Sequence, residues 1–153
     1  MAERTLIIIK PDCIQRQLAG EIIGRFEKKG FKLIAAKFMQ ISEELSRQLY
    51  KVHKGKEFFE SLVKYLSSAP VLITVWQADG VINIARRMIG ATSGYDAEGG
   101  TIRGDFSSSI RYNLVHGSDS AKSAEEEINL FFRPDEIVDY ELSNADWLGG
   151  TGK

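Results

Sequence analysis

The stretch "RTLIIIK", residues 4–10, decides the fold, because its continuous apolar run, ended by Pro11, predicts a buried strand. A second run of this kind, "PVLITVW" at 70–76, is rich in β-branched and aromatic residues. A third strand is expected at 31–40, which is apolar and partly alternating, and a short fourth one, "NLVH", at 113–116. These four segments predict one sheet.

The segments between these strands show the spacing of apolar residues that predicts helices. Residues 18–30 carry apolar side chains one turn apart and end in two lysines and Gly30, which is a helix stop. Two short helices are expected before the strand at 70–76, one from Ser42 to about Tyr50 and one within 56–66. The residues of the second that share one face are Phe58, Leu62 and Tyr65.

Two further helices flank the short last strand. Asp79 is expected to cap a helix that runs to Met88, and Ser120 to cap the final helix. The residues of the final helix expected to face inward are Ala124, Ile128 and Phe131. Residues 91–112 are rich in Gly and Ser and have no sustained period, which is typical of a functional or a disordered loop.

The element order reduces to a βαββαβ core with an inserted helical pair. We therefore expect an α+β, ferredoxin-like fold, with an antiparallel four-stranded sheet covered by helices. No repeat or linker divides the chain, so residues 1–153 are expected to form one domain, with a core over about 3–135 and an irregular, acidic tail over about 136–153.

Composition excludes several classes of protein. The net charge of −1 gives no basic field, so no dedicated nucleic-acid site is expected. The single cysteine, Cys13, excludes a disulfide framework and a cysteine-based zinc site. The N-terminal apolar run is too short to span a membrane and does not resemble a secretory signal, so a cytoplasmic protein is expected.

No familiar phosphate-binding loop occurs in a position to work. The chain has no G-x-x-x-x-G-K-[ST] loop before a helix, and no G-x-G-x-x-G after a strand. Cations that hold a phosphate must therefore gather locally. The candidates are Lys10 at the end of the first strand, Arg86 on the helix after the third, and Arg103 in the long loop; each alone also fits an ordinary surface charge.

The stretch "NLVHGSDS", residues 113–120, places His116 between the last strand and a helix start. The residues alone leave two interpretations of this histidine open: a reactive group on a turn, or a capping or packing residue. Ser118, Asp119 and Ser120 fit helix N-capping.

Taken together, the motifs resemble those of the nucleoside diphosphate kinase family. Its pattern N-x-x-H-[GS]-S-D is matched from Asn113 to Asp119. Further blocks match in order and spacing: "ERTLIIIKPD", "GEIIGRFEKKGFKLIAAKFMQ", "FFESLVKYLSSAPV", "MIGATS" and "GTIRGDF". The resemblance thus extends from residue 3 to residue 132 rather than resting on one histidine.

The resemblance implies an enzyme that passes the γ-phosphoryl group of ATP, or another nucleoside triphosphate, to nucleoside diphosphates and so maintains the NTP and dNTP pools. The implied mechanism is ping-pong, through a phosphohistidine at Nδ1 of His116. Glu127 is implied to hold the other ring nitrogen, and Lys10 to reach the sugar 3′-hydroxyl and the transferring phosphate.

Contacts to the phosphates are also implied by the resemblance. Arg86, Thr92 and Arg103 correspond to residues that hold the β- and γ-phosphates, and Tyr50 to a tyrosine near the γ-phosphate. Mg²⁺ is expected to bridge phosphate oxygens rather than to sit in a protein cage. Asp119 is implied either to contact it through water or only to cap the last helix.

The sugar and the base are implied to bind elsewhere in the same site. Asn113 corresponds to an asparagine that contacts the sugar hydroxyls. Phe58 corresponds to the residue that stacks on the base, with Ile110 on the other face and Leu62 nearby. Stacking suits any base, which fits broad substrate use. Ordinary core packing is the other interpretation of Phe58 and Leu62.

The chain departs from the family pattern at a few positions. Gly94 and Gly99 stand where prolines are usual, in a loop that helps pack subunits, so we expect weaker assembly than in a proline-bearing variant. Glu57 replaces another usual proline, and Arg111-Tyr112 stands where Gly-Arg is usual. The length of the tail implies a homohexamer, with a tetramer or a dimer as the alternative.

Two other function classes fit the same fold. One is a non-catalytic binding module, because a fold alone does not determine function. An RNA-reading version would need exposed aromatics on the central strands, and "LIIIK" and "VLITVW" offer few. The other is a purely structural oligomer that has lost activity, which would lack a site residue; none is missing here.

Overall fold

The computed structural model describes residues 2–148, and its sheet is built around the first strand. β1 (Ala2–Ile9) pairs antiparallel with β3 (Val71–Asp79) on one side and with β4 (Val115–Gly117) on the other. β2 (Lys32–Met39) pairs antiparallel with β3, which gives the strand order β2-β3-β1-β4. The expected ferredoxin-like α+β arrangement is therefore confirmed.

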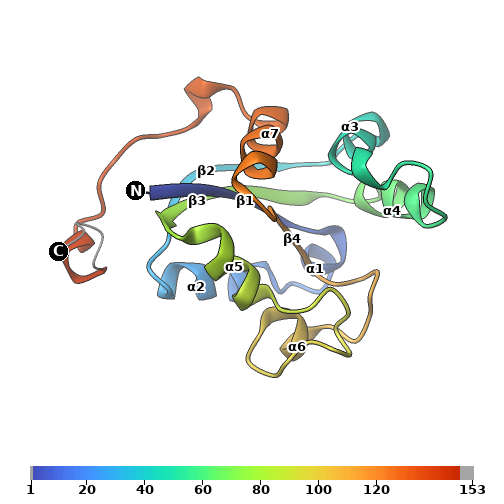
Figure 1. Ribbon diagram of the computed structural model, residues 1–153, viewed down its shortest axis with the longest axis horizontal. Helices are drawn as coiled ribbons and strands as arrows, with labels where there is room; N and C mark the ends of the chain where they lie inside the picture. The colour runs from blue at the N-terminus through green and yellow to red at the C-terminus, as the bar shows by residue number, and fades with distance from the viewer. Residues whose placement is uncertain (1, 149–153) are drawn as a thin grey trace.

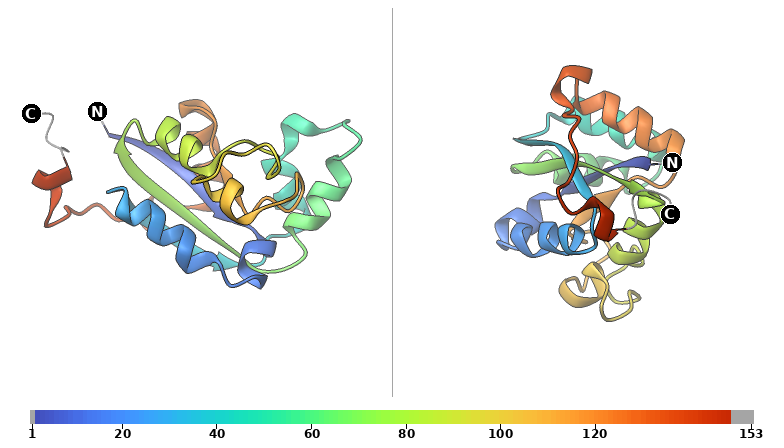
Figure 2. Two further views of the ribbon diagram at one scale, coloured as in Figure 1. Left: turned by 90° about the horizontal axis from the view of Figure 1, so that it is seen from below. Right: turned by 90° about the vertical axis from the view of Figure 1, so that its left-hand side faces the viewer.

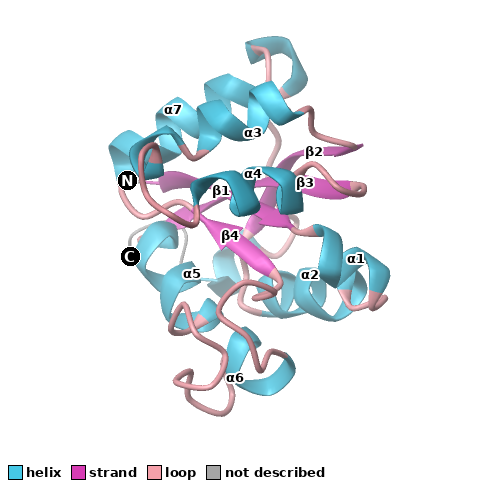
Figure 3. Ribbon diagram, turned by 90° about the vertical axis from the view of Figure 1, so that its right-hand side faces the viewer, coloured by secondary structure: helices cyan, strands magenta, loops and turns pink. Residues whose placement is uncertain are grey.

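Helices cover both faces of this sheet (Figure 1). One face carries α3 (Glu43–Leu49), α4 (Phe59–Leu66) and α7 (Ala121–Phe131). The other carries α1 (Pro11–Gln15), α2 (Ala19–Lys28), α5 (Val81–Ile89) and α6 (Ile102–Phe106). Figure 2 and Figure 3 show the same two layers from other sides, with β4 at the sheet edge.

The continuous apolar run of β1 follows from the helices that cover both faces of the sheet. Leu6 and Ile8 pack into the cluster beneath α3, α4 and α7, whereas Ile7 and Ile9 pack into the opposite cluster. Successive side chains of a strand point to opposite faces, so a strand covered twice needs apolar residues throughout. Cys13 on α1 is fully buried in the second of these clusters.

Two predicted helix starts are confirmed in detail. The Ser42 hydroxyl accepts the N–H of Leu45 at 3.1 Å at the start of α3. The Ser120 hydroxyl accepts the N–H of Ser123 at 3.1 Å at the start of α7. The residues of α7 expected inside are buried, namely Ala124, Ile128 and Phe131.

Two short helices were not expected. α1 begins with Pro11, which ends a strand but also suits the first turn of a helix, where no N–H partner is needed. α6 lies inside the segment expected to be a loop, and the Thr101 hydroxyl accepts the N–H of Gly104 at 3.0 Å as its cap. Five residues are too few to show a helical period, so Arg103 lies on a helix rather than in a loop.

Three predicted boundaries are wrong. α4 begins at Phe59, so the preceding Phe58 is 47% exposed and does not pack inward. The N-cap of α5 is Gly80 rather than Asp79, with a φ of 66° that glycine adopts without strain. The last strand starts at Val115 because Leu114 has a φ of 75°, which strand residues do not adopt.

The tail runs along the outer strand β2 after the short 3-10 helix η2 (Pro134–Glu136). The N–H of Val138 donates to the Ile34 carbonyl at 2.9 Å. The last described element of the tail is a second such helix, η3 (Ala145–Leu148), and the part of the predicted tail at 149–153 lies outside the described residues. Within 2–148, no helix combines the length and apolar character needed to cross a membrane.

Candidate active site

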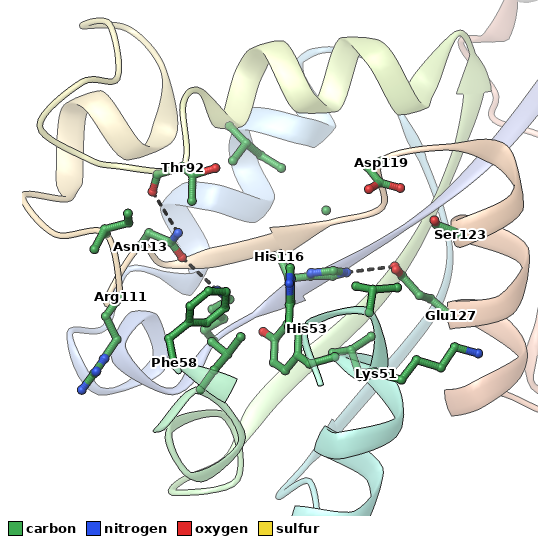
Figure 4. Close-up of a pocket in the computed structure, with 18 of the residues that line it drawn as sticks. Lys51, His53, Phe58, Thr92, Arg111, Asn113, His116, Asp119, Ser123 and Glu127 are labelled. Atoms are coloured by element: carbon green, nitrogen blue, oxygen red, sulfur yellow. Dashed lines mark hydrogen bonds and ion pairs between the residues drawn. The ribbon is translucent and has the colours of Figure 1, made fainter. Parts of the chain in front are cut away.

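A pocket of about 800 Å³ opens where β4 meets α5, α6, α7 and the α3–α4 pair (Figure 4). Every site residue expected from the sequence lines it, although these residues come from separate parts of the chain. They are Lys10, Tyr50, Phe58, Leu62, Arg86, Thr92, Arg103, Ile110, Asn113, His116, Asp119 and Glu127.

His116 is fixed on β4 by a carboxylate from α7. Its Nε2 lies 2.9 Å from Oε1 of Glu127, and both side chains are mostly buried. A carboxylate accepts hydrogen bonds, so Nε2 carries the proton and Nδ1 holds the free lone pair. The capping interpretation of His116 is wrong, since the N-cap of α7 is Ser120.

Ser118 completes this pair and was missed as a functional residue. It is buried, its hydroxyl donates to Oε1 of Glu127 at 2.8 Å, and it accepts the N–H of Leu6 at 3.1 Å. The expected N-capping role of Ser118 is therefore wrong. No local signal marked it, because its partners, Leu6 on β1 and Glu127 on α7, lie far from it in the sequence.

Lys10 is a buried cation at the end of β1. It is only 5% exposed, and its Nζ donates to Oδ1 of Asn113 at 2.9 Å. Nδ2 of Asn113 donates in turn to the carbonyl of Thr92 at 3.0 Å, so the amide is held from both ends. Burial, and then the charge of Arg103, lower the pKa of Lys10 to about 7.

Arg103 is held by backbone carbonyls rather than by an acid. Its guanidinium donates to the carbonyls of Asn113 (3.1 Å), Gly90 (3.3 Å) and Val115 (2.7 Å). Burial, and then the charge of Arg86, lower the pKa of Arg103 to about 10. Lys10, Arg86 and Arg103 thus repel one another in one pocket, which a polyanion would relieve.

Aromatic side chains form one wall of the pocket. The ring of Tyr50 meets that of His116 edge-on, with centroids 6.2 Å apart. The buried Tyr50 hydroxyl finds no hydrogen-bond partner among residues 2–148, and burial raises its pKa. His53 bridges Tyr50 and Phe58, with its ring centroid 5.3 Å from that of Phe58. His53 was missed because nothing in its local sequence marks it.

Phe58 and Ile110 stand exposed at the mouth, 47% and 68% respectively. Core packing is thus the wrong interpretation for Phe58, whereas Leu62 both packs against the core and lines the pocket. The Arg111 side chain turns away from His116 in Figure 4, and its Nη2 donates to the Ser61 hydroxyl on α4 at 3.1 Å. That bond links the two sides of the mouth.

Asp119 lies exposed on the pocket wall beside Ser123. A hydrogen bond from Ser123 and the charge of Arg86 lower the pKa of Asp119, so it is a carboxylate at neutral pH. It is not the N-cap of α7, so that expected role is wrong. Residues 2–148 contain no group of three or more His, Cys, Asp or Glu that could hold a metal ion.

Comparisons with known proteins agree with this geometry. The family model described as nucleoside diphosphate kinase matches residues 3–137. Nucleoside diphosphate kinase B of Bos taurus is 53% identical over 147 residues, which cover 96% of this chain and 97% of the bovine protein. The nucleoside diphosphate kinase of Bacillus cereus is 49% identical over 146 residues, covering 95% and 99% of the two chains.

A solved structure shares the architecture closely. The nucleoside diphosphate kinase of Halobacterium salinarum, in complex with CDP, superposes with a TM-score of 0.95 at 43% identity. The match covers 97% of this chain and 99% of the halophilic one. Sequence, fold and pocket therefore lead to one conclusion: the chain belongs to the nucleoside diphosphate kinase family, enzymes that transfer a phosphoryl group between nucleotides through a phosphohistidine.

Proposed function

We propose that His116 is the phosphohistidine of this nucleoside diphosphate kinase and that Nδ1 is its nucleophile. The observation that carries this proposal is the 2.9 Å contact between Nε2 and Glu127, which leaves Nδ1 as the nitrogen with a free lone pair. A neutral imidazole attacks without a separate base. The contact with Glu127 also favours the cationic ring that exists once Nδ1 is phosphorylated.

The reaction then runs in two balanced halves. In the first, Nδ1 attacks the γ-phosphorus, the bond to the β,γ-bridging oxygen breaks, and the nucleoside diphosphate leaves with that electron pair. In the second, a terminal oxygen of another nucleoside diphosphate attacks the same phosphorus, and the P–N bond breaks to restore neutral His116. Each half is an in-line displacement at phosphorus.

Lys10, Arg86 and Arg103 are proposed to hold the phosphates through both halves. Arg103 is already oriented by three carbonyls, so little reorganisation is needed when charge develops on the phosphoryl oxygens. The Thr92 hydroxyl and the Tyr50 hydroxyl, which has no hydrogen-bond partner within residues 2–148, supply further contacts. Lys10 contacts the transferring phosphate and the sugar 3′-hydroxyl.

The rest of the nucleotide is proposed to bind toward the mouth. Asn113 contacts the sugar hydroxyls, and the exposed ring of Phe58 stacks on the base, with Ile110 on the other face and Leu62 beside it. Stacking makes no demand on the base's hydrogen-bonding edge, so purine and pyrimidine nucleotides should both be accepted.

Mg²⁺ is proposed to enter with the nucleotide. Three carboxylates line the pocket, Asp119, Glu126 and Glu127, and Glu127 is occupied by His116 and Ser118. A hydrogen bond from Ser123 and the charge of nearby Arg86 lower the pKa of Asp119, which suits a metal held mainly by phosphate oxygens and contacted through water. When bound, the metal would neutralise charge on those oxygens. The protein's own part is to position Asp119 and to supply the three cations.

Assembly and location are also proposals. We propose a cytoplasmic homohexamer, with a tetramer or dimer as the alternative. Several large apolar side chains stand exposed on the described surface, among them Phe38 (63%), Tyr95 (81%) and Trp147 (91%), and burial between subunits would remove them from water. Sedimentation velocity at two protein concentrations distinguishes these states.

Radiolabelling tests the central proposal. The protein is incubated with ATP labelled at the γ-phosphate, and the label should be stable in base, labile in acid and located on His116. The chain has one other histidine, His53, which serves as a matched control. His53→Gln should still take up label and His116→Gln should not; undiminished labelling of His116→Gln would refute the proposal.

A further inference from the structure

The turn that leads into β4 is strained. Leu114 is fully buried and has a φ of 75°, a left-handed value that a leucine rarely adopts. The N–H of Val115 donates to the carbonyl of Asn113 at 2.9 Å, closing a three-residue γ-turn around Leu114. Such a turn persists only where its surroundings enforce it. Asn113 is the first residue of this turn and His116 directly follows it, so the turn fixes where both side chains point.

Asp12 grips this turn from the start of α1. Its Oδ2 accepts the N–H of Leu114 at 3.1 Å. Its Oδ1 accepts the hydroxyl of Tyr65, which anchors the carboxylate to α4. The backbone N–H of Lys10 donates to the carbonyl of Leu114 at 2.9 Å. The N–H and the C=O of Leu114 are therefore both held by one short segment, residues 10–12.

The same carboxylate is the counter-charge of Lys10. Around the Lys10 ammonium lie the guanidinium of Arg103, the amide of Asn113 and the ring of Tyr65, whose centroid is 5.9 Å from Nζ. Burial and Arg103 lower the pKa of Lys10, and Asp12 acts in the opposite direction. Other titratable groups that line the same pocket include Tyr50, Arg86, His116, Asp119, Glu126 and Glu127.

We propose that Asp12 is a positioning residue for phosphoryl transfer: it holds the γ-turn that aims Asn113 and His116, and it places a negative charge on the segment that carries Lys10. It does not line the pocket and so acts through these residues rather than on the substrate. The inference rests on the proposed roles of His116 and Lys10. It adds a residue that connects α4, whose Leu62 lines the pocket near the proposed base site, to the phosphate site.

Two variants separate the two actions. Asp12→Asn keeps the size and one acceptor oxygen but removes the charge. In kcat/KM measured from pH 5 to 9, we expect its alkaline limb, where Lys10 loses its proton, to move about one pH unit lower. Asp12→Glu keeps the charge and displaces the carboxylate oxygens. The alkaline limb of its kcat/KM profile should therefore stay at the wild-type pH, while the plateau value of kcat/KM falls at least tenfold.

Asp135→Asn is the matched control, because Asp135 is exposed, pairs with Arg133 on the tail and lies outside the pocket. It should reproduce the wild-type profile. An Asp12→Asn profile parallel to the wild type would overturn the counter-charge role. An unchanged plateau in Asp12→Glu would overturn the positioning role. If Asp12→Asn does not fold, Asp12→Glu still tests the proposal, because it keeps the native charge. Absence of label on wild-type His116 would instead refute the proposed function.

Discussion

We expect Lys10 to lower the free energy of unfolding of the protein while being required for its activity. The substitution Lys10→Met tests this expectation. Burial and Arg103 lower the pKa of Lys10 from 10.5 to about 7. At about 1.4 kcal/mol per pH unit, keeping the proton on Lys10 below pH 7 costs the nucleotide-free protein on the order of 5 kcal/mol. Methionine has a similar shape and no charge, so it escapes that cost.

The substitution also removes a contact. Oδ1 of Asn113 loses the ammonium that donates to it, which costs about 1–3 kcal/mol at a buried site. Lys10→Met should therefore be more stable than the wild type by about 2–4 kcal/mol at pH 6. It should lose activity by about a hundredfold or more, since the cation that contacts the transferring phosphate is gone.

The sign of the pH dependence follows from linkage. Between pH 7 and 10.5 the unfolded chain keeps the Lys10 proton and the folded one does not, so wild-type stability rises with pH over this range. The advantage of Lys10→Met should thus be constant below pH 7 and shrink above it, by at most about 1.4 kcal/mol per pH unit.

Urea unfolding at pH 6, 7, 8 and 9, at one protein concentration and without nucleotide, measures this difference. Lys64→Met is the control, because Lys64 is exposed on α4. It should differ from the wild type equally at each pH. A Lys10→Met protein that is less stable at pH 6, or whose advantage does not change above pH 7, would contradict the reasoning.

Three further predictions concern the site and its loop. Glu127→Gln keeps an acceptor for the histidine but not its charge, so rapid-quench assays with ATP should show phosphoenzyme formation about ten- to a hundredfold slower; an unchanged rate would exclude the charge effect. Gly99→Pro should leave the urea midpoint of unfolding unchanged or raise it, since nothing lies within 4 Å of a Cβ at that position. Gly94→Pro should lower this midpoint, since a Cβ there would lie 2.2 Å from a carbonyl oxygen. Equal effects of the two substitutions would be inconsistent with this packing. Arg111→Gly removes the bond to Ser61 across the mouth, and stopped-flow release of a fluorescent nucleoside diphosphate should be about two- to fivefold faster, whereas slower release would count against the link.

The regular elements were predictable where a local signal was strong. The apolar run at 4–10 gave β1, and the Ser120 cap gave α7, because each depends on residues adjacent in the chain. α6 was not predictable, since five residues around Gly104 show no period and tertiary contacts hold them. The γ-turn at Leu114 was equally hidden, because the groups that hold it lie about a hundred residues earlier.

The candidate site also combines features that the local sequence indicated with features that depend on tertiary packing. Ferredoxin-like order and the histidine motif indicated where chemistry would lie, but the gathering of Lys10, Arg86 and Arg103 depends on how separate elements pack. Their roles came from the family resemblance, since each cation alone resembles a surface charge. Ser118 and His53 were missed because their importance comes from partners brought close only by folding.

Cys13, buried on α1 three residues after Lys10, is a built-in probe of how often α1 detaches from the rest of the protein. Burial raises the pKa of its thiol to about 12, so almost no thiolate exists at neutral pH, and a thiol reagent cannot reach it while α1 is docked. The rate at which such a reagent modifies Cys13 under native conditions therefore measures how often this segment detaches. Because the chain has no other cysteine, that rate can be read without any introduced label, and its slowing by a nucleotide would measure how far the ligand secures α1.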